Sequence, residues 1–214
     1  MPKIVNKIAK SLIASDFFLN LGWGLLSPIF AIFILENITK GDSIKAVEVA
    51  GFAALSYWIT KSLFEIPLGY FLDKTPGEKD DFWFMVAGTL ITAIVPIGYL
   101  FSTTPLEIYV FQAIHALGMA MALPSWLAIF TRHIDNGKEA FEWSMETTSI
   151  GAGAGIAGGI GGIMAATFGF KMVFIFVSAL TFISVLLLLF IKDNVYPKTR
   201  EGARISAEKP VVEP

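Results

Sequence analysis

Six stretches of about 20 mostly apolar residues follow one another along the 214-residue chain, separated by short polar connections. A transmembrane helix needs roughly 20 apolar residues to cross a hydrocarbon core about 30 Å thick. The pattern predicts an all-α membrane protein with six transmembrane helices and no separate soluble domain. The predicted spans are residues 12–35, 49–72, 82–101, 106–130, 147–168 and 172–191.

Composition agrees with a chain whose main partner is membrane lipid. The mean hydropathy of +0.66 is too high for a soluble domain of this length. A net charge of −2 gives no reason to expect nucleic acid as a partner, and without cysteine no disulfide or cysteine-based metal site can form. Two histidines are a weak basis for a metal site, so we expect neither metal nor cofactor. The expected domains are a cytoplasmic segment 1–11, the membrane domain 12–191 and a disordered cytoplasmic tail 192–214.

Basic residues in the connections predict the orientation of the chain. Twelve lysines and arginines lie in the two ends and in the connections 73–81 and 132–139, against three in the connections on the opposite side. Basic residues gather on the cytoplasmic side of membrane proteins. We therefore expect a multi-pass protein of the cell membrane with both termini in the cytoplasm.

The second span carries two charges near the middle of the membrane. Lys61 lies twelve residues before Asp73, which places it roughly 18 Å from the cytoplasmic end of the helix. Glu65 is one turn away and can pair with Lys61. The two charges form a structural ion pair or line a pathway for a solute or proton. Either way, this stripe of the helix must face protein or water rather than lipid.

Other polar residues of the spans are candidates for the same pathway. Gln112 and His115 lie roughly 9 and 14 Å below the outer surface, where a histidine is either a proton relay or a hydrogen-bonded packing residue. In the first span, Asn20 is the deeper candidate for contact with a solute. Asp16 is one turn into the span and can reach cytoplasmic water.

The fifth span is rich in glycine. Gly151, Gly155 and Gly159 form one row at four-residue spacing, and Ala154, Gly158 and Gly162 form a second. Such rows allow another helix backbone to approach closely, so we expect this face to pack tightly and to serve as a dimer face. A phosphate-binding glycine loop is the alternative, but no adjacent Lys-Ser/Thr accompanies the run.

The sequence Gly69-Tyr-Phe-Leu-Asp73-Lys74, followed by Thr-Pro-Gly-Glu-Lys, resembles the loop signature between helices two and three of the major facilitator superfamily. Residues 124–144 and the glycine-rich fifth span also resemble this superfamily, and the resemblance covers nearly all of 12–192. Glu78 stands where a basic residue is usual. The fourth span lacks the arginine of many proton-coupled members, and the fifth lacks the Gly-Pro-x-x-Gly-Gly pattern of the antiporters.

The resemblance implies one half of a transporter built from two six-helix halves, with the solute site between the halves. Two copies with the same topology can rebuild that arrangement as a homodimer. We then expect secondary transport of a small solute by alternating access. The cytoplasmic gate is expected to contain Gly69, the pair Asp73 and Lys74, and Arg132 paired with Glu142 or Glu146. For each of these pairs, the alternative is an exposed ion pair without a gating role.

Three other interpretations stay open at the level of sequence. The chain can be a non-transporting subunit or regulator that pairs with a different half or a larger transporter. It can also be a piece of a full-length transporter. A membrane-embedded enzyme is the third, and the sequence argues against it because it contains no Gly-x-Gly-Asp, Gly-x-Ser-Gly or His-Glu-x-x-His motif.

Overall fold

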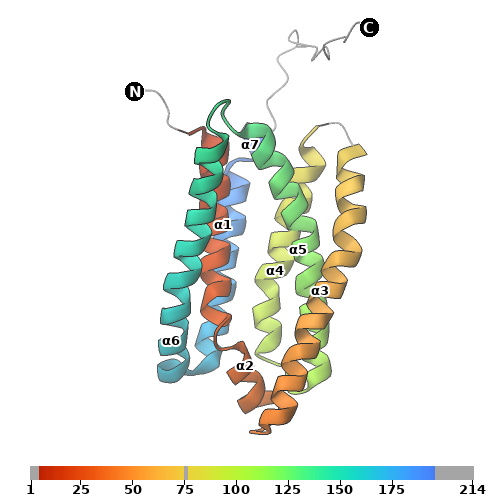
Figure 1. The fold of residues 1–214 in the computed structure, drawn as a ribbon, viewed down its shortest axis with the longest axis vertical. Helices are drawn as coiled ribbons and strands as arrows, with labels where there is room; N and C mark the ends of the chain where they lie inside the picture. Colours follow the sequence, from red (N-terminus) through yellow and green to blue (C-terminus); the bar gives the residue numbers. More distant parts are fainter. Residues whose placement is uncertain (1–4, 75–76, 196–214) are drawn as a thin grey trace, which may run out of the picture.

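The computed structural model describes residues 5–74 and 77–195. The regular elements of these residues are all helices, and the long helices run side by side along one axis (Figure 1). The elements are α1 (Lys7–Leu26), α2 (Phe30–Phe33), the π-helix η1 (Ile34–Ile38), α3 (Ser43–Lys74), α4 (Lys79–Tyr99), α5 (Pro105–His133), α6 (Glu139–Phe190) and α7 (Lys192–Val195).

Helix α6 contains both the predicted fifth span and the predicted sixth span. Its 52 residues are interrupted at Gly169, whose φ of 77° and ψ of 168° lie outside the helical region. A positive φ is easily adopted only by glycine. The chain reverses direction there, and the two parts of α6 lie antiparallel, the first in teal and the second in blue in Figure 1. With this reversal, the described residues contain the six predicted helices.

Helix α1 is broken where the sequence places Pro28. Residues 27–29 form a turn, and the segment Phe30–Ile38 then continues at an angle of 44° to α1. Proline has no N–H for the helical hydrogen bond and clashes with the preceding turn. Pro67, Pro96 and Pro124, in contrast, lie inside continuous helices.

Several of these helices have the length and apolar character of membrane spans. Among the described residues they are Lys79–Tyr99, Pro105–His133 and Glu139–Val195, with the bent pair of α1 and 30–38 as a fourth when counted as one span. The last stretch holds both parts of α6. Helix α3 is long enough at 32 residues but is less apolar, and it carries Lys61 and Glu65.

The bundle is held together by close contacts between α1 and α6, α4 and α5, α3 and α5, and α4 and α6. Small residues allow these approaches. A Cβ at Gly88 would lie only 2.3 Å from the carbonyl oxygen of Gly118, so α4 and α5 are nearly in backbone contact there. The Ser178 hydroxyl on the second part of α6 donates to the Ala93 carbonyl of α4 at 2.6 Å.

Both ends of the described chain lie at the same end of the bundle. The Lys7 ammonium donates to the Asn194 side chain at 2.9 Å, and the Asn6 amide donates to the His133 carbonyl at the end of α5. An even number of crossings requires this arrangement. The predicted tail 192–214 begins with α7, and its remaining residues lie outside the described part, as do residues 1–4 of the predicted segment 1–11.

Candidate functional site

A cavity of about 360 Å³ opens where α1 breaks. Its lining comes from the end of α1, from α2, from the middle of α3 and from α4 and α5. The lining residues are Trp23, Leu26, Ser27, Phe30, Ala54, Tyr57, Trp58, Tyr99, Gln112 and His115. The structure therefore brings the two polar candidates of the fourth span, Gln112 and His115, into one cavity with residues of four other segments.

His115 is held between aromatic side chains from two different helices. Its ring stacks on the indole of Trp23, with centroids 3.7 Å apart and planes 7° from parallel. On α3, the Tyr57 ring lies 4.9 Å from the His115 ring. Stacking fixes the plane of the imidazole, so its nitrogens have a defined direction within the cavity wall.

Three buried polar atoms of the cavity lining have no hydrogen-bond partner among the described residues. They are the indole nitrogen of Trp23, the hydroxyl of Tyr99 and Nδ1 of His115. Buried polar groups in native proteins are nearly always paired, because an unpaired one costs free energy. Their gathering on one cavity is the arrangement expected where a molecule supplies the missing partners.

The predicted ion pair of α3 is present. The Lys61 ammonium lies 2.9 and 3.0 Å from the two carboxylate oxygens of Glu65, and Lys61 is only 8% exposed although much of α3 around it faces outward. The same ammonium lies 5.6 Å from the centre of the Trp58 ring. Because Trp58 lines the cavity, the ion pair is next to the cavity without lining it.

Asp16 and Asn20 lie apart from the cavity, on the side of α1 that faces α6. The Asn20 amide donates to the Asp16 carboxylate at 3.0 Å. The carboxyl of Asp16 also interacts with that of Glu146 on α6, and Glu146 is only 3% exposed. The central polar residues therefore form three groups, and Glu146 lies with the pathway candidates rather than with the expected gate.

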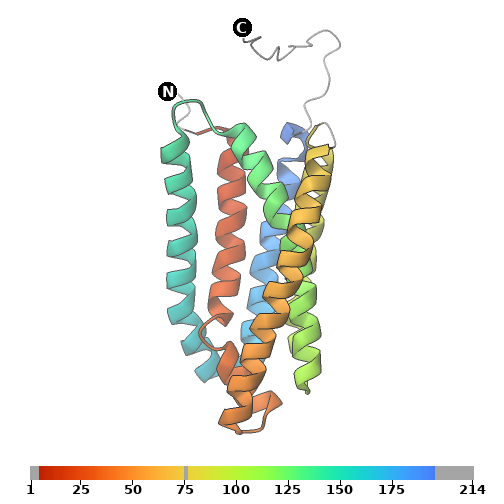
Figure 2. The same ribbon diagram turned by 45° about the vertical axis from the view of Figure 1, so that its right-hand side comes forward.

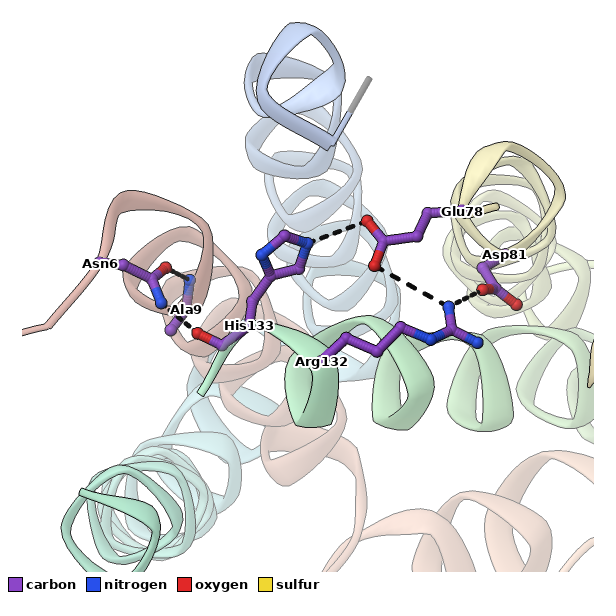
Figure 3. A network of polar contacts seen from close by, with 6 residues as sticks. All are labelled: Asn6, Ala9, Glu78, Asp81, Arg132 and His133. Carbon is purple, nitrogen blue, oxygen red and sulfur yellow. Dashed lines mark hydrogen bonds and ion pairs between the residues drawn. The ribbon is translucent and has the colours of Figure 1, made fainter. Parts of the chain in front are cut away.

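Arg132 lies in the last turn of α5 and joins this helix to the start of α4. Its guanidinium pairs with the carboxylate of Asp81 and lies 3.9 Å from a Glu78 oxygen (Figure 3). The expectation that Arg132 pairs with Glu142 or Glu146 is wrong, because the start of α4 brings two carboxylates closer than α6 does. Asp73 at the end of α3 adds a further electrostatic interaction with Arg132.

The same network ties in the amino-terminal end of the chain. Nε2 of His133 lies 2.9 Å from Glu78, and the Asn6 amide donates to the His133 carbonyl while its oxygen accepts from the Ala9 N–H at 2.8 Å (Figure 3). Helices α1, α4 and α5 are thus linked at the end of the bundle that holds both termini. Sequence reasoning did not identify Asn6, Glu78, Asp81 or His133 as members of one group.

The remaining gate candidates are spread over that end. Glu142 is fully buried and accepts from the Asp135 N–H at 3.4 Å, whereas Asp73 and Lys74 are exposed. The Lys74 ammonium lies 4.3 Å from the Tyr70 ring. A Cβ added at Gly69 would meet no atom within 4 Å. A gating role for these residues stays a prediction.

Asp135, in the connection between α5 and α6, has a local electrostatic partner. Its carboxylate accepts from the Lys138 ammonium at 3.2 Å and from the Asn6 amide at 3.4 Å. The hydrogen bond from Lys138 is the largest cause that holds the pKa of Asp135 below its ordinary value, and the hydrogen bond from Asn6 lowers this pKa further. The Asp135 contacts are therefore present at neutral pH.

The first part of α6 stands at the edge of the bundle (Figure 2). The predicted glycine face lies on its outer side, away from the other described helices. A Cβ added at any of these glycines would meet no atom within 4 Å; they are Gly151, Gly155, Gly158, Gly159 and Gly162. A different row, Gly153, Ala157 and Gly161, packs on α1. The first part of α6 therefore does pack tightly within the chain, as the sequence predicts. The contact is made by this third row and not by the two predicted rows of glycines.

Five aromatic residues of the cavity were not among the predicted site residues: Trp23, Phe30, Tyr57, Trp58 and Tyr99. Aromatic residues are common in membrane helices, so their presence alone indicates no site. Pro28 was the available sequence signal for the cavity, because proline breaks a helix and irregular backbone inside a membrane bundle is tolerated where it lines a cavity.

A comparison with protein families agrees with the fold and with the six-helix membrane topology. The family model described as Major Facilitator Superfamily matches residues 12–213, which is nearly the whole chain. No curated protein matches the sequence. Members of this family are secondary transporters and not enzymes. The chain, a multi-pass membrane protein with six helices, therefore belongs to the Major Facilitator Superfamily.

Proposed function

We propose that the chain transports a small solute by alternating access and that two copies, related by a twofold axis along the membrane normal, form the complete transporter. Family membership implies secondary transport, and the six helices of this chain supply one of the two halves that such a mechanism needs. Two identical halves with the same orientation are the simplest assembly.

The observation that carries the dimer proposal is the bare glycine face of α6. Five glycines in two adjacent rows have no neighbour within 4 Å of the position of a Cβ. In a membrane there is little hydrophobic gain from pairing apolar helices, and close backbone approach through small residues is a main source of association. We therefore place the first part of α6 against the partner copy.

The proposed solute pathway joins the three polar groups of α1, α3, α5 and α6. It comprises the cavity with Gln112 and His115 and the adjacent ion pair Lys61 and Glu65. Asp16, Asn20 and Glu146 continue it toward the end that holds both termini. The excess of basic residues at that end supports a cytoplasmic location for it in this proposal.

The lack of cysteine makes the dimer directly testable, because single cysteines can be introduced without background. Gly155→Cys and Gly159→Cys should each give a disulfide-linked dimer in native membranes. Ile94→Cys on α4, where the side chain is exposed, is the matched control and should stay monomeric. Cross-linking to a different protein would favour the interpretation as a subunit of another complex, and equal cross-linking at all three positions would contradict the proposal.

Alternating access is testable before the solute is known. A cysteine at Ser27, which lines the cavity, should react with a membrane-impermeant maleimide in both right-side-out and inside-out vesicles. Ile94→Cys should react in neither. Labelling of Ser27→Cys from one side only would contradict alternating access.

Transport itself depends on the ion pair in this proposal. Once a transported solute is identified, Lys61→Ala and Glu65→Ala should each reduce its uptake into proteoliposomes, because each leaves one charge of the pair without its partner. Unchanged uptake in both variants would exclude the ion pair from the pathway.

A further inference from the structure

We infer that the cavity at the α1 break binds a neutral, flat ring compound that carries a hydrogen-bond acceptor, such as an aromatic amide. The inference rests on the proposed function for its biological purpose, since it names the class of solute. The chemistry of the ligand is argued from the ten lining residues that this chain supplies.

The shape of the ligand follows from the walls of the cavity. Five of the ten lining residues are Trp, Tyr or Phe, and the imidazole of His115 is a sixth ring. Aromatic rings interact best with other flat rings through offset or edge contacts. A cavity of about 360 Å³ is within the range of small-molecule sites. A flat ring therefore uses this lining better than a branched or polyhydroxylated solute, which needs more polar partners than Gln112, Ser27 and the few ring polar atoms provide.

The need for an acceptor follows from the unpartnered atoms. The indole nitrogen of Trp23 is a donor only, and the Tyr99 hydroxyl can donate as well. A carbonyl oxygen can accept from these groups. A ligand with no acceptor, such as a quaternary ammonium ion, would leave the buried Trp23 N–H unpaired.

The neutral charge follows from the electrostatics of the lining. No Lys, Arg, Asp or Glu lines the cavity in the described residues. The nearest ammonium identified beside it, that of Lys61, is already paired with Glu65. A charged ligand would therefore lose its hydration without gaining a partner of opposite charge.

A matched set of probes tests this inference on the purified full-length protein in nanodiscs. Benzamide is the neutral aromatic amide; benzoate and benzamidinium keep its shape with opposite charges, and cyclohexanecarboxamide keeps the amide without the flat ring. Binding is measured by calorimetry, which does not depend on transport. We expect benzamide to bind at least about tenfold more tightly than each of the other three.

Conservative variants locate the binding. Trp23→Phe and Tyr99→Phe keep the rings but remove one polar group each, and each should weaken benzamide binding about tenfold. Gln112→Ala is a third variant at a less buried position. Trp126→Phe is the matched control, because the Trp126 indole nitrogen is also buried without a partner among the described residues but lies away from this cavity. It should leave benzamide affinity unchanged.

Several results would overturn the inference. They are no measurable benzamide binding, equal or tighter binding of a charged probe or of cyclohexanecarboxamide, and unchanged affinity in all three cavity variants. The proposed function fails separately: if benzamide binds at this cavity but Ser27→Cys is labelled from one side only, the site stands and alternating access does not.

Discussion

The two sides of the first part of α6 have nearly the same composition and opposite surroundings. On the inner side, a Cβ at Gly161 would lie 2.1 Å from the carbonyl oxygen of Leu25. On the outer side, a Cβ at Gly155 or Gly159 would meet nothing within 4 Å. One glycine row is thus used for packing within the chain, while the other is available for a second copy.

The effect of a small residue in a membrane helix therefore depends on what packs against it. Glycine costs helix stability wherever it lies in a helix interior. On the inner side that cost is offset by close packing with α1. On the outer side the described residues provide no such compensation, which is why we assign that side to the partner copy.

The largest effect is expected at Gly161. Gly161→Val would force its side chain into the backbone of α1, and we expect a loss of about 3 kcal/mol or more in the free energy of unfolding. Unfolding in detergent by SDS titration, followed by circular dichroism, measures this change. Gly159→Val, two residues earlier on the outer side, is the matched control and should fold as stably as the original chain; equal losses in both variants would contradict the difference between the sides.

A smaller loss is expected on the α1 side of the same contact. A Cβ at Gly24 would lie 2.9 Å from the Cβ of Ala157 and from the Cα of Ala154. Gly24→Ala should therefore lower the free energy of unfolding by about 1–3 kcal/mol. Adding Ala157→Gly removes one of the two clashes and should recover part of the loss. If the double variant is no more stable than the single one, the clash lies elsewhere.

The outer rows should affect association rather than folding. We expect Gly155→Val combined with Gly159→Val to leave the unfolding midpoint nearly unchanged and to abolish the dimer, because bulky side chains prevent close helix approach. Native mass spectrometry from nanodiscs separates monomer from dimer. A dimer that persists in this variant would place the interface on another surface.

The smallest effect is expected from one added methyl group at Gly162, where the surroundings are open. Gly162→Ala should raise the free energy of unfolding of the monomer by up to about 1 kcal/mol, because alanine is the better helix former. The same unfolding titration detects it. A loss of stability here would mean that the outer side is packed within the chain after all.

Several features followed from the sequence because they depend on local spacing. The ion pair of Lys61 and Glu65 follows from a separation of one helical turn, and the structure has it at 2.9 Å. The six helices and the common location of both ends follow from the number and length of the apolar stretches. The break of α1 has its cause in Pro28.

Other features depend on how the helices are rotated and ordered, and these were not accessible from spacing. Arg132 is closer in sequence to Glu142 and Glu146 than to Asp81, yet it pairs with Asp81 because α4 packs beside α5. Glu146 was expected at the gate and lies beside Asp16 because α1 packs on α6. The aromatic cavity likewise needs residues from five segments to meet.

The apolar stretches and the loop motif were enough to identify a six-helix membrane protein of the major facilitator type. Lipid requires every backbone polar group to be satisfied within a helix, so length and apolarity alone specify the spans. Which face of each helix packs inside the chain became clear from the folded bundle alone. That choice depends on contacts between residues far apart in the sequence, such as Gly161 with Leu25 and Trp23 with His115, and those contacts left one glycine face bare and one aromatic cavity with unpaired donors.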